Sequence, residues 1–333
     1  MKIGIIGATG MLGHHLAIAA QIRQYELVVI HRPESDLEKI RDLRFEAREA
    51  DLKDKKSLLD AFEGLDAVAN CASYYPTTPK PLSEEIKVAR LQMKFFLAAV
   101  KEAKIKRALY VGGDAVLPKV KEGLAREDDS IEKQPEGASN YVQIKWLMDK
   151  MARDAAKDGL PVTIGIPSMT FGSYDFSPTT GKLIVEIANR NLKGYVNGNR
   201  NVVSAEDAGR GLLLALEKGE FGERYLITGE NTDVKTIVKT IGECADVPLP
   251  KMVLPLSLAK IFSKAQEIRY TLFQGPEPQL SSTALSVLAG SQHLDGSKAK
   301  VALNYTPDHT MKEAIEKALI WFERNGYVNN PGH

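Results

Sequence analysis

The stretch IGIIGATGMLG at residues 3–13 decides the fold, because an apolar run leads directly into three glycines. Gly7 suits a tight turn out of a strand, Gly10 lets a pyrophosphate approach the backbone, and Gly13 lets the next helix pack closely on the strand. The N-terminus of that helix offers free N–H groups and the positive end of its dipole to the phosphates. The stretch therefore predicts the strand, turn and helix of a dinucleotide-binding site.

Strands and helices alternate along the first half of the chain. Short apolar runs predict strands at residues 2–6, 26–30, 45–49, 67–70, 108–111 and 162–166. Apolar residues at helical spacing predict helices at residues 55–62, 83–103 and 141–158. Short continuous apolar strands are typical of parallel sheets that are covered on both faces. The fold class that follows is α/β, a Rossmann doubly wound parallel sheet with helices on both faces.

After the sixth predicted strand, prolines, glycines and short elements become frequent. The expected elements are a loop and helix start at 172–181, a β-hairpin at 195–203, and helices at 205–217, 256–271 and 311–325. The helix at 256–271 is a candidate lid or dimer face. We expect a cofactor-binding domain at residues 1–170, which also receives 200–230, and a smaller C-terminal α/β substrate lobe at residues 171–199 and 231–333.

Composition and charge exclude several classes of protein. Across 333 residues the formal net charge is +1, so the charge balance favours neither nucleic acid nor an acidic membrane surface as a partner. Cys71 and Cys244 have no metal-binding spacing, so we expect neither disulfides nor a metal site, and a reducing cytoplasm is the natural compartment. No apolar run approaches the roughly 20 residues that a membrane span needs. These features favour a cytoplasmic enzyme with a small-molecule substrate and leave open whether it forms a homodimer.

The end of the second predicted strand, VIHRP at residues 29–33, indicates which dinucleotide is bound. An NAD site places Asp or Glu here to hold the ribose 2′-OH, whereas Arg32 carries a guanidinium that suits a 2′-phosphate. Ser35 adds a hydroxyl donor toward the same phosphate. Asp36 is the acidic competitor, but we expect it to cap a helix at residues 37–43. NADP(H) is therefore the expected cofactor, and the alternative is that Arg32 is a solvated loop charge.

Tyr141 and Lys145 are the candidate catalytic pair. Four residues apart on one predicted helix, they share a face, so the ammonium can lower the pKa of the phenol and hold the cofactor ribose. The phenol can then exchange a proton with a substrate oxygen. Of eleven tyrosines, Tyr141 is the only one followed by Lys at this spacing. Its place after the fifth strand of a dinucleotide-binding sheet favours a catalytic role over chance spacing.

Other candidates carry less information. His14 and His15 begin the first helix, and we expect them at the surface, with at most one of them touching phosphate. Tyr74 and Tyr75 follow the fourth strand, where they either line the substrate cleft or pack the loop. Four cations of the second half either collect a substrate diphosphate or are scattered surface charges: Lys182, Arg190, Lys193 and Arg200.

These motifs resemble those of the extended short-chain dehydrogenase/reductase superfamily, and the resemblance covers nearly the whole chain. GATGMLG at residues 7–13 looks like its nucleotide turn, and Tyr141 with Lys145 matches its catalytic pair. Within the superfamily, three segments look closest to bacterial dihydroflavonol-reductase-like proteins: residues 32–33, 226–231 and 318–322. Such proteins are often described as nucleoside-diphosphate-sugar epimerases. The resemblance implies the Rossmann fold and an oxidoreductase or epimerase activity.

The resemblance also implies further cofactor contacts. Asp51 and Leu52 look like the pair that contacts adenine, and residues 70–73 like the strand end beside the cofactor. Residues 166–172 resemble the proline-containing segment beside the nicotinamide, and residues 203–210 resemble a helix-opening acidic segment. The implied cofactor-binding set is Gly7, Thr9, Gly10, Met11, Leu12, Gly13, His31, Arg32, Ser35, Asp51, Leu52, Cys71, Ala72, Ser73, Val111, Gly112, Tyr141, Lys145, Pro167, Ser168 and Met169.

One position departs from the superfamily pattern. Where its members carry a Ser or Thr hydroxyl that polarises the substrate oxygen, this chain has Gly113. A backbone N–H, Ser168, Asp114 or the substrate itself must then supply the hydrogen-bond donor, or the reaction is slow or different. Asp114 matches the acid of sugar-nucleotide dehydratases or simply caps the turn. Ala115 stands where those enzymes carry a Glu, which argues against dehydration.

The sequence thus predicts an NADP(H)-dependent oxidoreductase that reduces a carbonyl compound by hydride transfer. In this interpretation Tyr141 is the proton donor, Lys145 holds the ribose, and Tyr74, Tyr75, Ser168 and Lys182 are candidates for contacting the carbonyl or alcohol substrate. Two alternatives remain. One is a nucleoside-diphosphate-sugar epimerase that uses the same pair, and the other is a non-catalytic NADP(H)-binding sensor, which the missing hydroxyl at Gly113 favours.

Overall fold

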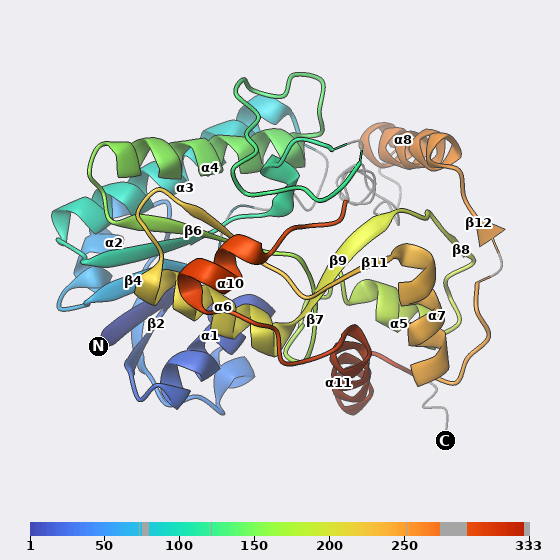
Figure 1. Cartoon of the computed structure of the whole chain (residues 1–333). Coiled ribbons are helices and arrows are strands. Elements are labelled where there is room, and N and C mark those ends of the chain that lie inside the picture. Colours follow the sequence, from blue (N-terminus) through green and yellow to red (C-terminus); the bar gives the residue numbers. More distant parts are fainter. Residues whose placement is uncertain (73, 75–79, 121, 251, 274–291, 330–333) are drawn as a thin grey trace.

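A seven-stranded parallel sheet forms the centre of the computed structural model, which describes residues 1–72, 74, 80–120, 122–250, 252–273 and 292–329 (Figure 1). Its strands are β1 (Lys2–Ile6), β2 (Glu26–His31), β3 (Glu46–Glu49), β4 (Ala67–Asn70), β5 (Arg107–Val111), β6 (Val162–Pro167) and β10 (Arg224–Ile227). They lie in the order β10-β6-β5-β4-β1-β2-β3, and every neighbouring pair is parallel. This is the order of a doubly wound sheet, so the predicted fold class is confirmed.

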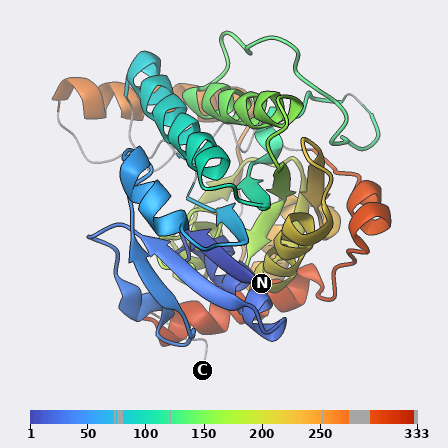
Figure 2. The same cartoon turned by 90° about the vertical axis from the view of Figure 1, so that its left-hand side faces the viewer.

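Helices cover both faces of this sheet (Figure 2). They are α1 (Met11–Ile22), α2 (Lys55–Phe62), α3 (Leu82–Glu102), α4 (Asn140–Lys157), α6 (Ala205–Lys218) and α10 (Ser297–Leu303). One hydrophobic core contains residues of α2, α3 and α4, and the other contains residues of α1, α6 and α10. Side chains alternate along a strand, so Ile3 and Ile5 of β1 enter one core and Ile6 enters the other.

A second group of elements lies beyond the carboxyl ends of these strands (Figure 1). It comprises β7 (Met169–Phe171), β8 (Gly194–Tyr195), β9 (Asn199–Ser204), β11 (Glu230–Asp233), β12 (Met252–Val253), α5 (Lys182–Ala188), α7 (Val234–Cys244), α8 (Leu256–Phe273) and α11 (Met311–Arg324). A three-stranded sheet in the order β11-β9-β7 shares a third core with α5, α7 and α11. In the part of the chain that the structure describes, no helix is both long and apolar enough to cross a bilayer.

The predicted hairpin at residues 195–203 is wrong. β8 pairs in parallel with β12, and β9 lies between β7 and β11. The Asn197 side-chain oxygen accepts a hydrogen bond from the Lys235 N–H at 3.1 Å, and the Gly198 carbonyl accepts one from the Val234 N–H at 3.0 Å. The turn residues that suggested a hairpin therefore hold the first turn of α7.

Other predicted elements of the connecting regions differ less. The helix expected at residues 37–43 is a single 3-10 turn, η1 (Leu37–Ile40), and the Asp36 carboxylate caps it as predicted. The helices expected at 205–217 and 311–325 are confirmed as α6 and α11. β10 adds a seventh strand beside β6. The division of the chain into a cofactor domain and a substrate lobe stays a prediction.

A buried ion pair fixes α4, the helix that carries the candidate catalytic pair. Arg224 of β10 donates two hydrogen bonds to the Asp149 carboxylate of α4, from Nε at 2.9 Å and from Nη2 at 2.6 Å. Its Nη1 also donates to the Glu127 carbonyl at 3.1 Å, and the Glu127 carboxylate accepts from the Leu226 N–H at 3.0 Å. Both charges are satisfied in a low-dielectric setting, so α4 has a fixed position relative to β10.

Candidate functional site

The glycine turn between β1 and α1 has three glycines with three different constraints. Gly7 has a φ of +85°, a left-handed conformation that favours glycine. A Cβ on Gly13 would overlap the Gly7 carbonyl oxygen, because α1 packs directly on the turn. A Cβ on Gly10 would meet only that oxygen, at 3.6 Å. Gly7 and Gly13 are thus required by the fold, whereas Gly10 leaves space on the side where a ligand would approach.

The start of α1 fits a dinucleotide pyrophosphate. Gly10 is the N-cap residue, so no side chain caps the first N–H groups of the helix. Free N–H groups at a helix N-terminus bind phosphate oxygens. Thr9, Met11 and Leu12 lie at the same helix start and are partly exposed. The residues expected to bind the pyrophosphate therefore lie together.

Arg32 lies just after the end of β2, with its side chain 60% exposed and its Nη1 3.1 Å from Glu34 Oε1. An exposed pair of this kind contributes little to stability, so Arg32 can exchange Glu34 for a phosphate at small cost. The Ser35 hydroxyl accepts a hydrogen bond from the Arg32 N–H at 3.2 Å, and His31 Nδ1 lies 2.9 Å from the Arg32 carbonyl oxygen. The structure brings these three predicted residues into one turn, and the preference for NADP(H) stays a prediction.

Asp51 and Leu52, the predicted adenine contacts, follow β3. The Asp51 carboxylate accepts a hydrogen bond from the Lys53 N–H at 2.7 Å, and Leu52 enters the core beside α2. A turn contact and core packing therefore account for both side chains. Their role toward adenine stays a prediction.

The end of β4 lies against the glycine turn. A Cβ on Gly7 would be 3.0 Å from the Ala72 Cβ, so Ala72 and Gly7 are neighbours. The Cys71 N–H donates to the Ile6 carbonyl at 3.0 Å, and burial raises the pKa of the Cys71 thiol to about 12, which keeps it neutral. Ser73 lies outside the described residues.

Tyr74 belongs to the packing between α3 and α4. Its hydroxyl donates to Glu85 Oε1 at 3.4 Å, and the Asn140 amide donates to Glu85 Oε2 at 2.5 Å. Burial and the Glu85 carboxylate raise the pKa of Tyr74. These contacts connect Tyr74, through Glu85, to the first turn of α4. A substrate contact for Tyr74 stays a prediction, and Tyr75 lies outside the described residues.

Tyr141, Lys145 and Gly113 meet at the carboxyl edge of the sheet. Ser139 caps α4 by accepting a hydrogen bond from the Val142 N–H at 3.4 Å, which places Tyr141 in the first turn. Tyr141 and Lys145 are buried, and Lys145 Nζ lies 6.0 Å from the centroid of the Tyr141 ring. A Cβ on Gly113 would be 3.1 Å from the Tyr141 hydroxyl and 3.9 Å from Lys145 Cε. Burial lowers the pKa of Lys145 to about 8.

The other predicted residues of this edge are held by backbone contacts. Val111 enters the core beside α1, and the Gly112 N–H donates to the Gly165 carbonyl at 2.9 Å, which fixes the approach of the chain to Gly113. Pro167 ends β6, and Met169 packs partly on the third core. The main chain therefore positions the ends of β5 and β6 side by side.

Asp114 and Arg200 form an electrostatic pair beside Gly113. Burial raises the pKa of Asp114, and the charge of Arg200 opposes that shift. Burial lowers the pKa of Arg200 to about 10, and Asp114 opposes that shift in turn. One of the two alternatives for the four cations was that they are scattered surface charges. That alternative is wrong for Arg200, which is buried, whereas Lys182, Arg190 and Lys193 are exposed. In the sequence, the available signal was weak: Arg200 lies two residues before the apolar pair Val202 and Val203.

Ser168 stands out at the junction of β6 and β7. Its N–H donates to the Ile227 carbonyl at 3.1 Å, and its carbonyl accepts from the Thr170 hydroxyl at 2.9 Å. Its own hydroxyl is buried and has no hydrogen-bond partner within the described residues. Native proteins pair nearly all buried polar atoms, so an unpaired hydroxyl at this edge points to a ligand contact.

The expectation that His14 and His15 lie at the surface is wrong. His14 Nε2 lies 3.0 Å from Asp42 Oδ2, and its ring stacks on Tyr174 with 3.7 Å between centroids. His15 Nε2 lies 3.2 Å from the Ser173 carbonyl oxygen. Burial lowers the pKa of both histidines, that of His15 to about 4, so both are neutral near pH 7. They pack α1 against the loop that follows β7.

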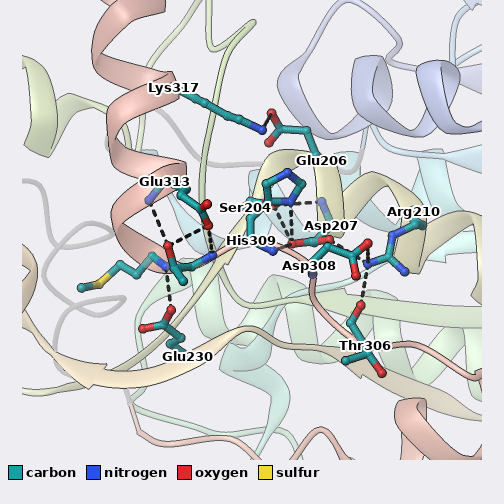
Figure 3. Close-up of polar contacts among 12 residues, drawn as sticks. Ser204, Glu206, Asp207, Arg210, Glu230, Thr306, Asp308, His309, Glu313 and Lys317 are labelled. Carbon is teal, nitrogen blue, oxygen red and sulfur yellow. Dashed lines mark hydrogen bonds and ion pairs between the residues drawn. The ribbon is translucent and has the colours of Figure 1, made fainter.

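The helix-opening acidic segment is a structural anchor (Figure 3). The Asp207 carboxylate at the start of α6 accepts hydrogen bonds from the Ser204 hydroxyl at 2.9 Å and from Arg210 Nη2 at 2.8 Å. It also accepts from the N–H groups of Asp308 and His309, each at 3.0 Å. With so many donors around it, this carboxylate ties the segment before α11 to α6 and is not available for proton transfer.

Comparison with known proteins gives consistent relatives. The model of the NAD dependent epimerase/dehydratase family matches residues 3–228, which contain the glycine turn, Tyr141 and Lys145. A solved nucleoside-diphosphate-sugar epimerase from Pseudomonas aeruginosa is 37% identical, with 99% of each chain covered and a TM-score of 0.85. A putative dihydroflavonol 4-reductase from Synechocystis sp. is 28% identical over 97% of this chain and 95% of its own length. Sterol demethylase protein B from Methylococcus capsulatus is 25% identical over 97% of this chain and 99% of its own length.

Two glycine variants separate binding from folding. Gly10→Ala should leave the thermal transition unchanged and remove most dinucleotide binding, because the added methyl has room in the protein but lies where a pyrophosphate would approach. Gly13→Ala should instead lower the melting temperature by roughly 5 °C or more, because its methyl overlaps the Gly7 carbonyl. Thermal unfolding and NADPH fluorescence titration measure the two effects. Wild-type affinity in Gly10→Ala would place the cofactor elsewhere.

Proposed function

The chain belongs to the NAD-dependent epimerase/dehydratase family, as its motifs indicated, and we propose that within this family it reduces a carbonyl compound with NADP(H). The observation that carries the proposal is the buried pair Tyr141 and Lys145 next to Gly113, at the edge of the sheet where the glycine turn begins α1. In open α/β sheets this carboxyl edge is where ligands bind. Residues 171–199 and 231–333 are proposed to supply the substrate side of the site.

The proposed chemistry assigns one task to each residue. The bound nicotinamide supplies the hydride. Tyr141 donates its hydroxyl proton to the oxygen that becomes negative as the carbonyl is reduced. Lys145 has a pKa of about 8 and is therefore mostly an ammonium at neutral pH, so it stabilises the negative charge left on Tyr141. Its ammonium is also the proposed contact for the cofactor ribose.

Ser168 is the proposed replacement for the hydroxyl missing at Gly113. A reduction builds negative charge on the substrate oxygen, and a pre-positioned donor lowers the barrier for that step. The Ser168 hydroxyl is buried without a hydrogen-bond partner among the described residues and belongs to the strand end next to β5. Such a donor needs no reorganisation when charge develops.

The charges around the site support an uncharged carbonyl substrate. Of the four cations considered for a sugar-nucleotide diphosphate, the one that is buried, Arg200, already has Asp114 as a counter-charge. Ala115 lacks the carboxylate that a dehydratase would need. The similarity to the putative dihydroflavonol 4-reductase from Synechocystis sp. also favours reduction.

A second candidate function is epimerisation of a nucleoside-diphosphate sugar. The similarity to the Pseudomonas aeruginosa epimerase favours it. An epimerase uses the same Tyr and Lys but returns the hydride to its substrate, so it consumes no NADPH.

Replacing the proton donor tests the proposed function. Tyr141→Phe should reduce aldehyde-dependent NADPH oxidation by roughly 10²- to 10⁴-fold and leave NADPH affinity nearly unchanged, because the phenol acts on the forming alkoxide. Tyr25→Phe, which removes only the hydrogen bond to Glu217, is the matched control with wild-type turnover expected. Steady-state assays over a panel of aldehydes and ketones measure the effect. Sugar epimerisation without NADPH oxidation would favour the epimerase, and absence of any turnover would favour the cofactor-binding sensor.

Removing the proposed donor tests Ser168. Ser168→Ala should lower kcat by about 10- to 100-fold with little change in KM, since the hydroxyl acts mainly on developing charge. Adding Gly113→Ser to this variant should restore part of the loss, because it returns a hydroxyl to this edge of the sheet. The added Cβ would lie 3.1 Å from the Tyr141 hydroxyl, which must shift by a few tenths of an ångström to admit it. A wild-type kcat in Ser168→Ala would assign the role to another donor.

Cofactor selection depends on Arg32. NADPH should bind more tightly than NADH, and Arg32→Ala should narrow the gap by roughly 1–3 kcal/mol, the contribution of a charge-assisted contact. Glu34→Gln should act in the opposite direction, because it removes the carboxylate 3.1 Å from the guanidinium. Titration calorimetry with both cofactors measures the difference. Equal affinities in the wild-type protein would contradict the assignment.

A further inference from the structure

Glu85 is a buried acidic residue to which the proposed reaction gives no task. It lies in the first turn of α3 and is only 1% exposed. In the part of the chain that the structure describes, its carboxylate is held by two hydrogen bonds and by no cation. The positive end of the α3 dipole favours a negative charge at this point. Because burying a charge costs free energy unless donors surround it, the position of Glu85 depends on the two groups that donate to it.

The two donors come from segments that are far apart in the sequence. Tyr74 follows β4, and its hydroxyl donates to Glu85 Oε1 at 3.4 Å. Asn140 is the first residue of α4, and its amide donates to Glu85 Oε2 at 2.5 Å. The same amide donates to the Lys80 carbonyl, just before α3, at 2.9 Å. Since α3 and α4 lie side by side on one face of the sheet (Figure 2), Glu85 joins their first turns.

The first turn of α4 is the part of this helix that most needs an external contact. The first N–H groups of a helix have no partners within it, and terminal turns open more easily than helix centres. Tyr141 lies in this turn, directly after Asn140, whereas Lys145 lies one turn further in. The cap hydrogen bond from the Val142 N–H to the Ser139 hydroxyl is long, at 3.4 Å. A reacting group displaced by about 1 Å can lose roughly 10²-fold in rate, so movement of this turn would matter.

We propose that Glu85 is a positioning residue for the proton donor. Through Asn140 it holds the first turn of α4, so that the Tyr141 hydroxyl stays beside Gly113. The inference rests on the proposed function, in which Tyr141 protonates the forming alkoxide. Glu85 itself touches neither substrate nor cofactor in this arrangement. Its hydrogen bonds carry the role, so a side chain that keeps equivalent bonds to both neighbours should replace it.

Exchanges that conserve side-chain shape at this junction test the proposal. Asn140→Asp places a second carboxylate against Glu85 and should lower kcat for aldehyde reduction by about 10- to 100-fold, with KM and NADPH affinity nearly unchanged. Adding Glu85→Gln should restore roughly fivefold or more, because its amide can donate to the new carboxylate while its oxygen still accepts from Tyr74. Glu84→Gln, at the exposed neighbouring position of α3, is the matched control with wild-type kinetics expected.

A second readout does not depend on turnover. Fluorine NMR of the full chain labelled with fluorotyrosine gives a Tyr141 resonance, which Tyr141→Phe identifies by its loss. Asn140→Asp should shift or broaden this resonance, and the double variant should return it toward its wild-type position. An unchanged resonance, a double variant no better than Asn140→Asp, or a loss of NADPH affinity equal to that of kcat would overturn the positioning role. Full activity in Tyr141→Phe would instead overturn the proposed function, and thermal unfolding confirms that each variant is folded.

Discussion

The contact between α1 and the glycine turn is the constraint on which the rest of the architecture depends. α1 can approach the Gly7 carbonyl only because Gly13 lacks a side chain. On its other side, α1 meets α6 at Gly209, where a Cβ would overlap the His15 backbone. Two glycines therefore hold α1 between the turn and α6. Since α6 begins at the Asp207 anchor, this close packing connects the cofactor end of the sheet to the segment before α11.

The site itself consists of charges held away from water. Lys145, Asp114 and Arg200 all have pKa values shifted toward their neutral forms by burial. Such burial costs stability, and it persists because the surrounding structure is fixed independently, for example by the hydrogen-bonded ion pair of Arg224 with Asp149. In the proposed reaction, these charges would act more strongly on the Tyr141 hydroxyl than they would in water, since charges interact more strongly in a low dielectric.

Local periodicity was sufficient to predict the sheet, and the spacing of Tyr141 and Lys145 was sufficient to place them on one helix face. The position of Gly113 beside them was implied by the resemblance to the superfamily. Contacts between distant segments could not be predicted in this way. The turn at Asn197 has the residues of a hairpin, but its side chain accepts a hydrogen bond from the Lys235 N–H in the first turn of α7. The burial of His14 depends on Tyr174, and the burial of Arg200 beside Asp114 depends on packing between separate strands. Short-range sequence patterns do not encode such partners.

The Asp207 anchor also has a consequence for how the chain folds. Two of its donors come from residues 101 and 102 positions further along the sequence. Contacts of such high sequence separation form late, because a long loop must be closed before they contribute. During synthesis the main sheet can therefore assemble while the Asp207 carboxylate is still hydrated. We expect the arrival of residues 308 and 309 to dehydrate it, so that α11 docks after the segment around α6 has formed.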